Sequence, residues 1–131
     1  MHNIKADEVL VVITPDEPGI YGRVLGTLAN AGVNLRAISV HSEGDKGHFR
    51  LLTADTARAA KVLKSLGFKV TVDKVITIEI GDRIGSGAEI GALLGNAVIL
   101  IEYCFGSSAG TGSALLVFKT NNNKKAIETL R

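Results

Sequence analysis

Two short loops carry the residue types that could bind a charged small molecule. They read Asp16-Glu17-Pro18-Gly19-Ile20 and Asp82-Arg83-Ile84-Gly85-Ser86. Each loop follows an apolar run and precedes a helical pattern. Backbone N–H groups at the start of a helix, around Gly19 and Ile20, favour an anion, and a glycine lets the backbone approach a ligand closely. The loops are therefore candidate sites for a carboxylate.

Asp16 and Asn34 supply the complementary chemistry. A zwitterion also needs acceptors for its ammonium group, which the Asp16 carboxylate provides, and the Asn34 amide could bridge to either charged group. A purely structural interpretation stays open for the same residues. Asp16 could cap the helix, Pro18 and Gly19 could form the turn, and Asn34 could begin a strand.

The two loops belong to two similar halves of the chain. At an offset of 66 residues, identical residues recur: Asp16 and Asp82, Gly19 and Gly85, Leu28 and Leu94, Asn30 and Asn96, Ala31 and Ala97. Further on, Thr53–Leu63 aligns with Thr120–Leu130 at an offset of 67. The sequence is therefore a tandem of two units, 1–73 and 74–131, with one residue inserted in the second.

Each half shows the same order of elements. In the first unit, apolar runs and turn residues predict strands at 9–14, 35–41, 48–53 and 68–73, with helices after Pro18 and around Ala59 to Leu66. The second unit predicts strands at 75–80, 99–105 and 114–120, and helices at 85–97 and from Asn123. The second unit lacks a counterpart of the last strand of the first unit. Either the natural protein continues for about ten more residues, or the sheet edge is open and must be covered or paired.

This pattern resembles the ACT domain, a small regulatory module of amino-acid metabolism. The resemblance rests on an apolar strand, the Asp-Glu-Pro-Gly loop, an amphipathic helix ending Ala29-Asn30-Ala31-Gly32-Val33-Asn34, and the βαββαβ order. It covers nearly the whole chain as two copies, like the stand-alone tandem ACT proteins. It implies an α+β fold, with two ferredoxin-like repeats whose antiparallel sheets pack side by side and whose helices lie on one face.

The resemblance also implies a function. A free amino acid would bind at the seam between repeats, between the loop after the first strand of one unit and the second strand of the other. The implied ligand-binding residues are Asp16, Glu17, Pro18, Gly19, Ile20, Asn34, Leu35, Asp82, Gly85 and Ser86. The protein would sense the amino acid and change its association, as a homodimer or with an enzyme of amino-acid metabolism, without catalysing a reaction or holding a cofactor.

The second repeat matches the ACT pattern less well than the first. Ile84 stands in place of proline, Gly87 in place of a large apolar residue, and Val98 in place of the glycine that ends the helix. Leu100 aligns with Asn34 and cannot make its hydrogen bonds. We therefore expect two unequal sites. The alternative is a structural dimerisation module in which the ligand loops are vestigial.

A third hypothesis is nucleotide binding. Strand 76–80, the glycines Gly85 and Gly87, the following helix and Glu102 imitate a dinucleotide-binding fingerprint. In that fingerprint the first glycine follows the strand almost at once, whereas four residues intervene here. The first unit has the same layout without the second glycine, which favours the repeat interpretation.

Catalytic and metal-binding residues find little support in the sequence. His2 is expected in a frayed terminus, and His41 and His48 are expected as solvated residues beside a hairpin turn, with no Cys or Glu cluster near them. Cys104 is expected to pack on its strand, because no histidine is placed to activate it. The loop after the first strand also lacks the arginine of a phosphate-binding loop. It carries Asp16 and Glu17 instead, and these two acids would repel a phosphate.

Composition narrows the partners. The chain has 131 residues and a net charge of +2, and its longest basic run is Lys124-Lys125, so nothing favours nucleic acid. The single cysteine fits a reducing compartment. The N-terminus carries acids where a secretory signal would be basic. The most apolar stretch, 90–101, is shorter than the roughly 20 residues needed to span a bilayer. These features predict a cytoplasmic protein without membrane contact.

Overall fold

A computed structural model describes residues 3–131 of the protein, so the expectation for His2 lies outside the described residues. The elements in chain order are β1 (Asn3–Pro15), α1 (Ile20–Asn30), β2 (Leu35–Glu43), β3 (Lys46–Thr53), α2 (Thr56–Lys64), β4 (Lys69–Gly81), α3 (Ser86–Asn96), β5 (Ile101–Ser108), β6 (Ser113–Thr120) and α4 (Asn123–Leu130). This is an α+β protein with two βαββαβ-like repeats. Of the helices described, none is long and apolar enough to cross a membrane.

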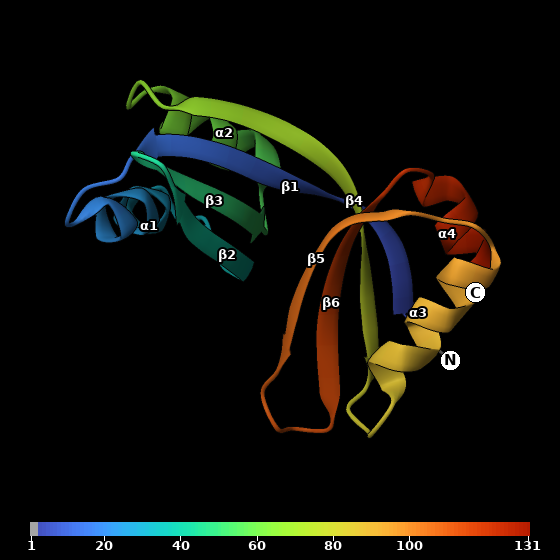
Figure 1. Cartoon of the computed structure of the whole chain (residues 1–131). Helices are drawn as coiled ribbons and strands as arrows, with labels where there is room; N and C mark the ends of the chain where they lie inside the picture. The colour runs from blue at the N-terminus through green and yellow to red at the C-terminus, as the bar shows by residue number, and fades with distance from the viewer. Residues whose placement is uncertain (1–2) are drawn as a thin grey trace. The chain divides into compact units, whose positions relative to one another are not determined.

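The strands follow the order β2-β3-β1-β4-β6-β5, in which neighbours are hydrogen-bonded (Figure 1). The chain forms two compact units. The first is Glu8–Asp73, and the second joins Lys74–Arg131 to the N-terminal segment that ends at Asp7. The long strands β1 and β4 each contribute to both units. Each unit therefore has four strands, with the order β2-β3-β1-β4 in the first unit and β1-β4-β6-β5 in the second.

The core of the first unit lies between its strands and the helices α1 and α2. In α1, Ile20, Val24 and Leu28 are buried at helical spacing. They meet apolar residues that alternate along β1 and β3, where Leu10 lies opposite Leu51 and Val12 opposite Phe49. Ala59 and Leu63 of α2 complete the cluster. The predicted helices and strands of this unit are therefore present. The helical spacing in α1 and the alternation along β1 and β3 each place their apolar residues on the face that forms this core.

The second unit has an equivalent core. Ile90 and Leu94 of α3 are fully buried, and Ala126 and Leu130 of α4 join them against Ile76 and Ile78 of β4, Phe118 of β6 and their neighbours. Antiparallel pairing joins β6 to both β4 and β5. The dinucleotide-fold hypothesis is wrong, because that fold needs β4 and β5 as parallel neighbours, whereas β6 lies between them.

Residues 3–7 complete the sheet of the second unit. Ile4 packs against its core, the Asn3 amide Nδ2 donates to Glu79 Oε2 at 3.0 Å, and Thr77 Oγ1 lies 3.5 Å from Asp7 Oδ2. The sequence predicted a first strand beginning at Val9, and a second unit without its last strand. In the structure β1 begins six residues earlier, and its start occupies that fourth position. The polar residues around Ile4 hid this strand, because only one large apolar side chain marks its buried face.

Candidate ligand-binding loops

Backbone hydrogen bonds hold the first loop between β1 and α1. The Asp16 N–H donates to the Asp45 carbonyl at 3.0 Å, which ties the loop to the β2–β3 turn. The Ile20 N–H donates to the Glu17 carbonyl at 3.2 Å and so closes the turn that begins the helix. Asp16, Glu17 and Pro18 are exposed. The chain itself therefore determines the loop shape, and the loop side chains face solvent.

The N-terminus of α1 has no side-chain cap. Gly19 is the N-cap residue, with a left-handed φ of 88° that strongly favours glycine, and no side chain accepts from the first helical turn. The capping interpretation of Asp16 is therefore wrong, whereas the turn interpretation of Gly19 is confirmed. The Ile20 N–H is already bonded, but the N–H groups of Tyr21 and Gly22 lie in the first turn, where a helix supplies no partner. These two residues were missed by the sequence analysis, although their place in the first turn was the signal.

The carboxylates of this loop are available for a ligand. Within residues 3–131, no side chain is hydrogen-bonded or ion-paired to Asp16 or Glu17. An uncapped helix start therefore lies beside two free acids. This combination offers N–H donors to a carboxylate and oxygen acceptors to an ammonium group.

Asn34 and Leu35 lie at the other end of α1. The 11 residues of this helix span about 16 Å, so a single unit does not bring Asn34 to the Asp16 loop. Asn34 is exposed, and its carbonyl accepts from the Ala54 N–H at 2.9 Å. Leu35 packs against the core. The candidate residues of the first unit thus form two separate groups.

The second loop repeats the backbone of the first. The Asp82 N–H donates to the Gly112 carbonyl at 3.0 Å in the β5–β6 turn. Gly85 is the N-cap of α3 with a φ of 89° and no side-chain cap, and the Glu89 N–H donates to its carbonyl at 3.0 Å. The repeat detected in the sequence therefore extends to the hydrogen bonds of the two loops.

The side chains of the second loop differ because they bond to one another and to the chain. Ser108 Oγ donates to the Asp82 carboxylate, and the buried Ser86 hydroxyl donates to the Gly81 carbonyl at 2.8 Å. Arg83 makes a bidentate ion pair with Glu89, at 3.0 and 2.8 Å, whose hydrogen bonds and charge raise the pKa of Arg83. This loop offers no free acid comparable to Asp16.

Leu100 takes the place of Asn34 in the second unit. It is 65% exposed, and its backbone N–H donates to Asn121 Oδ1 while its carbonyl accepts from the Asn121 N–H, each at 3.0 Å. An apolar side chain therefore faces solvent where the first unit presents an amide.

Known proteins share this architecture. A protein from Bacteroides thetaiotaomicron is 26% identical, with a TM-score of 0.90 over 97% of this chain and 88% of that one. The ligand-free regulatory subunit of aspartate kinase from Thermus thermophilus is 15% identical, with a TM-score of 0.73 over 98% of this chain and 93% of that one. A structure of aspartokinase alpha and beta subunits is 19% identical, with a TM-score of 0.68 over 98% and 94%.

No curated protein sequence matches the chain. The family model for an ACT domain pair matches residues 6–130, which is almost the entire sequence. Two βαββαβ-like repeats with duplicated loops are the architecture that such a pair requires. The chain therefore belongs to the ACT domain pair family.

Proposed function

We propose that this protein is a regulatory module that binds a free amino acid and catalyses no reaction of its own. The observation that carries the proposal is the first loop, in which the uncapped start of α1 lies beside the free carboxylates of Asp16 and Glu17. Membership of the ACT domain pair family supports the regulatory role. The single cysteine fits a cytoplasmic location.

The two groups of candidate residues point to a ligand shared between two chains. A ligand cannot touch Asp16 and Asn34 of one unit, because α1 separates them by about 16 Å. The second unit offers Leu100 in place of the amide. An amino acid that uses both Asp16 and Asn34 therefore joins the first units of two copies. Its binding would favour a homodimer, and this linkage gives the module two states that a ligand can shift.

An enzyme of amino-acid metabolism is the proposed target of the regulation. Two structures with the same fold are subunits of aspartate kinase, one of them a regulatory subunit. Their fold supports the idea of a partner enzyme. A change in association on amino-acid binding is a signal that such a partner could read.

A dimerisation module without a ligand is the second candidate. Large apolar side chains are exposed in the second unit, where Ile84 is 102% and Val98 85% exposed, and Leu100 lies two residues further on. Exposed apolar side chains of this kind favour contact with another protein. In this case the two loops would connect strand to helix and would bind no ligand.

A thermal-shift screen against the twenty amino acids, with nucleotides as controls, separates the two candidates. A ligand at about 100 times its Kd stabilises the fold by roughly 2.7 kcal/mol, which raises the Tm by several degrees. We expect a shift with one amino acid or a related few. Asp16→Asn should abolish it, whereas the matched variant Asp82→Asn should retain it.

Sedimentation of the same samples tests the shared site. Asn34→Ala should remove the ligand-dependent increase in mass while leaving the unliganded protein folded. A screen in which no amino acid raises the Tm would instead support the dimerisation module. Equal loss of the shift in Asp16→Asn and Asp82→Asn would contradict the preference for the first loop.

A further inference from the structure

The hairpin of β2 and β3 brings two histidines face to face. His41 and His48 lie directly opposite each other in the antiparallel register, and their rings stack at a centroid distance of 5.0 Å with 12° between their planes. The pairing continues to Glu43 and Lys46, so only two residues form the turn. Both histidines are therefore strand residues, held by the ladder on each side.

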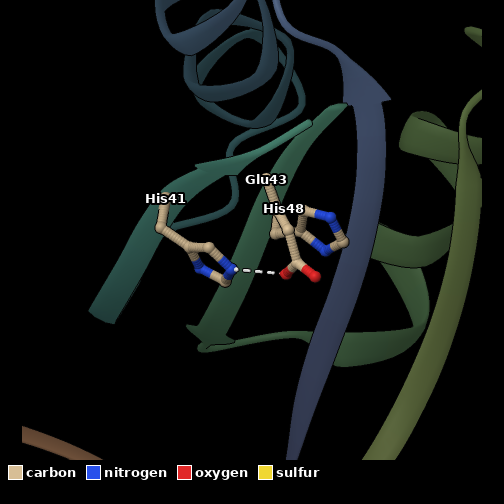
Figure 2. A group of neighbouring side chains, drawn as sticks. All are labelled: His41, Glu43 and His48. Atoms are coloured by element: carbon tan, nitrogen blue, oxygen red, sulfur yellow. Dashed lines mark hydrogen bonds and ion pairs between the residues drawn. The ribbon is translucent and has the colours of Figure 1, made fainter. Parts of the chain in front are cut away.

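Glu43 adds a third possible metal ligand to the two histidines. It follows His41 by two residues in β2, so both side chains lie on one face of the strand. The His41 Nε2 atom is 3.4 Å from Glu43 Oε2, and Figure 2 shows the carboxylate between the two imidazoles. One ligand atom from each of the three residues lies within 4.8 Å of the others. From the sequence we expected no Cys or Glu cluster near the histidines, because Glu43 was placed in the turn after the strand 35–41 rather than on the strand itself.

We propose that His41, Glu43 and His48 bind a divalent transition-metal ion of the zinc type. Two imidazoles and one carboxylate suit Zn²⁺ or Ni²⁺ rather than Ca²⁺ or Mg²⁺, which prefer oxygen ligands alone. Ligand atoms about 2.0–2.1 Å from a tetrahedral zinc ion lie roughly 3.3 Å apart. His41 and Glu43 already have this spacing, and rotation of the His48 side chain brings in the third ligand.

Solvent exposure makes this an open site. The side chains of His41 and Glu43 are 43% and 74% exposed, so water can fill the remaining coordination position. Glu43 supplies the negative charge that offsets part of the charge of the ion. Lys46 lies opposite Glu43 in the register, and its positive charge repels a bound cation. These features place the site among exchangeable metal sites rather than closed structural ones.

The ion would also brace the first ligand loop. The ligands flank the turn that contains Asp45, whose carbonyl accepts from the Asp16 N–H at 3.0 Å. A metal ion that joins β2 to β3 would therefore hold the turn on which the loop rests. The metal site itself stands independently of amino-acid binding, because none of its three ligands belongs to the candidate loop.

The second unit provides an internal comparison. The pair equivalent to His41 and His48 is Ser107 and Leu115, which lie opposite each other in β5 and β6. Ala109 takes the place of Glu43. The second hairpin therefore has none of the three ligands, and a single site per chain is expected.

Calorimetric titration of the untagged full chain with ZnCl₂ tests the proposal. We expect one ion per chain, with a matching perturbation of the His41 and His48 imidazole signals in NMR spectra. His41→Gln and His48→Gln should each weaken binding by at least about a hundredfold, since even second-shell partners typically contribute 10–100-fold. Glu43→Gln should weaken it less, because the amide oxygen can still coordinate.

Two control variants make the test specific. His2→Gln removes the remaining histidine, and Glu102→Gln removes a carboxylate that pairs with Lys119 in the hairpin without histidines. Both should bind zinc like the wild type. Absence of binding at millimolar zinc would overturn the proposal. Wild-type affinity in the His41→Gln/His48→Gln double variant, with an unchanged circular dichroism spectrum, would overturn it as well.

Discussion

The two units have the same loop backbone but different loop chemistry. In both, an aspartate N–H bonds to the turn of the following hairpin, and a glycine with a φ near 90° begins the helix without a side-chain cap. In the first unit the acids are free, whereas in the second Asp82 accepts from Ser108 and Arg83 pairs with Glu89. A duplicated fold therefore preserves the backbone of a site more readily than its chemistry.

The two units also stabilise their helices in the same way. Arg58 Nε donates to the Ala31 carbonyl at 2.6 Å, and Lys125 Nζ donates to the Ala97 carbonyl at 2.7 Å. In each case a cationic side chain from the second helix of the unit binds the end of the first, where the helix dipole favours positive charge. Contacts that depend on backbone position persist even though the cation itself has changed.

Removal of residues 1–7 should have the largest effect and should act on one unit. The second unit would lose its fourth strand and the contact of Ile4 with its core. We expect a cost of about 3–5 kcal/mol from the lost apolar burial and ladder hydrogen bonds. Hydrogen exchange should show faster exchange at Phe118 and in α4, with smaller changes at Phe49 of the first unit.

A point variant distinguishes the loss of the strand's contact with the core from the shortening of the chain. Ile4→Asp should reproduce part of the loss, because it puts a charge against an apolar core. Lys5→Ala, at an exposed neighbouring position, is the matched control and should leave exchange unchanged. Equal acceleration in both units would contradict the assignment of this segment to the second unit.

Substitutions at Gly32 and Val98, the residues that follow the first helix of each unit, should have the next largest effect. Gly32 has a φ of 74°, and the exposed Val98 has a φ of 58°, which is unfavourable for a β-branched residue. Gly32→Val should therefore destabilise the protein by about 1–3 kcal/mol, and Val98→Gly should stabilise it by about 1 kcal/mol. Chemical denaturation measures both values. A Val98→Gly variant less stable than the wild type would show that the strain is relieved elsewhere.

The N-caps of the second helices should respond equally in both units. Asp55 accepts from the Arg58 N–H at 3.1 Å, and Asn122 accepts from the Lys125 N–H at 3.0 Å. Asp55→Ala and Asn122→Ala should each cost about 1 kcal/mol, because each leaves a helix N–H without its partner. Thermal unfolding of the two variants provides the comparison. A much larger loss in one of them would mean that the units do not share this contact energetically.

Cys104 should show the smallest effect, on reactivity rather than stability. Although part of its surface is exposed, burial raises the pKa of the Cys104 thiol, because desolvation penalises the thiolate. Less thiolate is present at a given pH, so alkylation by iodoacetamide should be slower in the folded protein than in urea. The rise of the alkylation rate with pH should occur at higher pH in the folded protein than in the unfolded protein. Coincident profiles would contradict this environment for the thiol.

Local patterns predicted most of the fold. The alternation along β3 and the spacing of Ile20, Val24 and Leu28 place the strands and helices, because burial of one face requires these periods. The glycines at 19 and 85 mark the turns, since few other residues adopt a positive φ. The ends of β2 and β3 were less well predicted, because Glu43 and Lys46 look like turn residues although the ladder includes them.

The sequence by itself determined the duplication, the ACT frame and the inequality of the two repeats, because repeated residue types and turn glycines are local properties. Only the tertiary structure decided which distant segments meet. It assigned residues 3–7 to the second unit, separated Asp16 from Asn34 by the length of α1, and brought Glu43 to His41 and His48. The first relation depends on pairing between segments that no local pattern connects, the second on the length of a regular helix, and the third on the register of the β2–β3 hairpin.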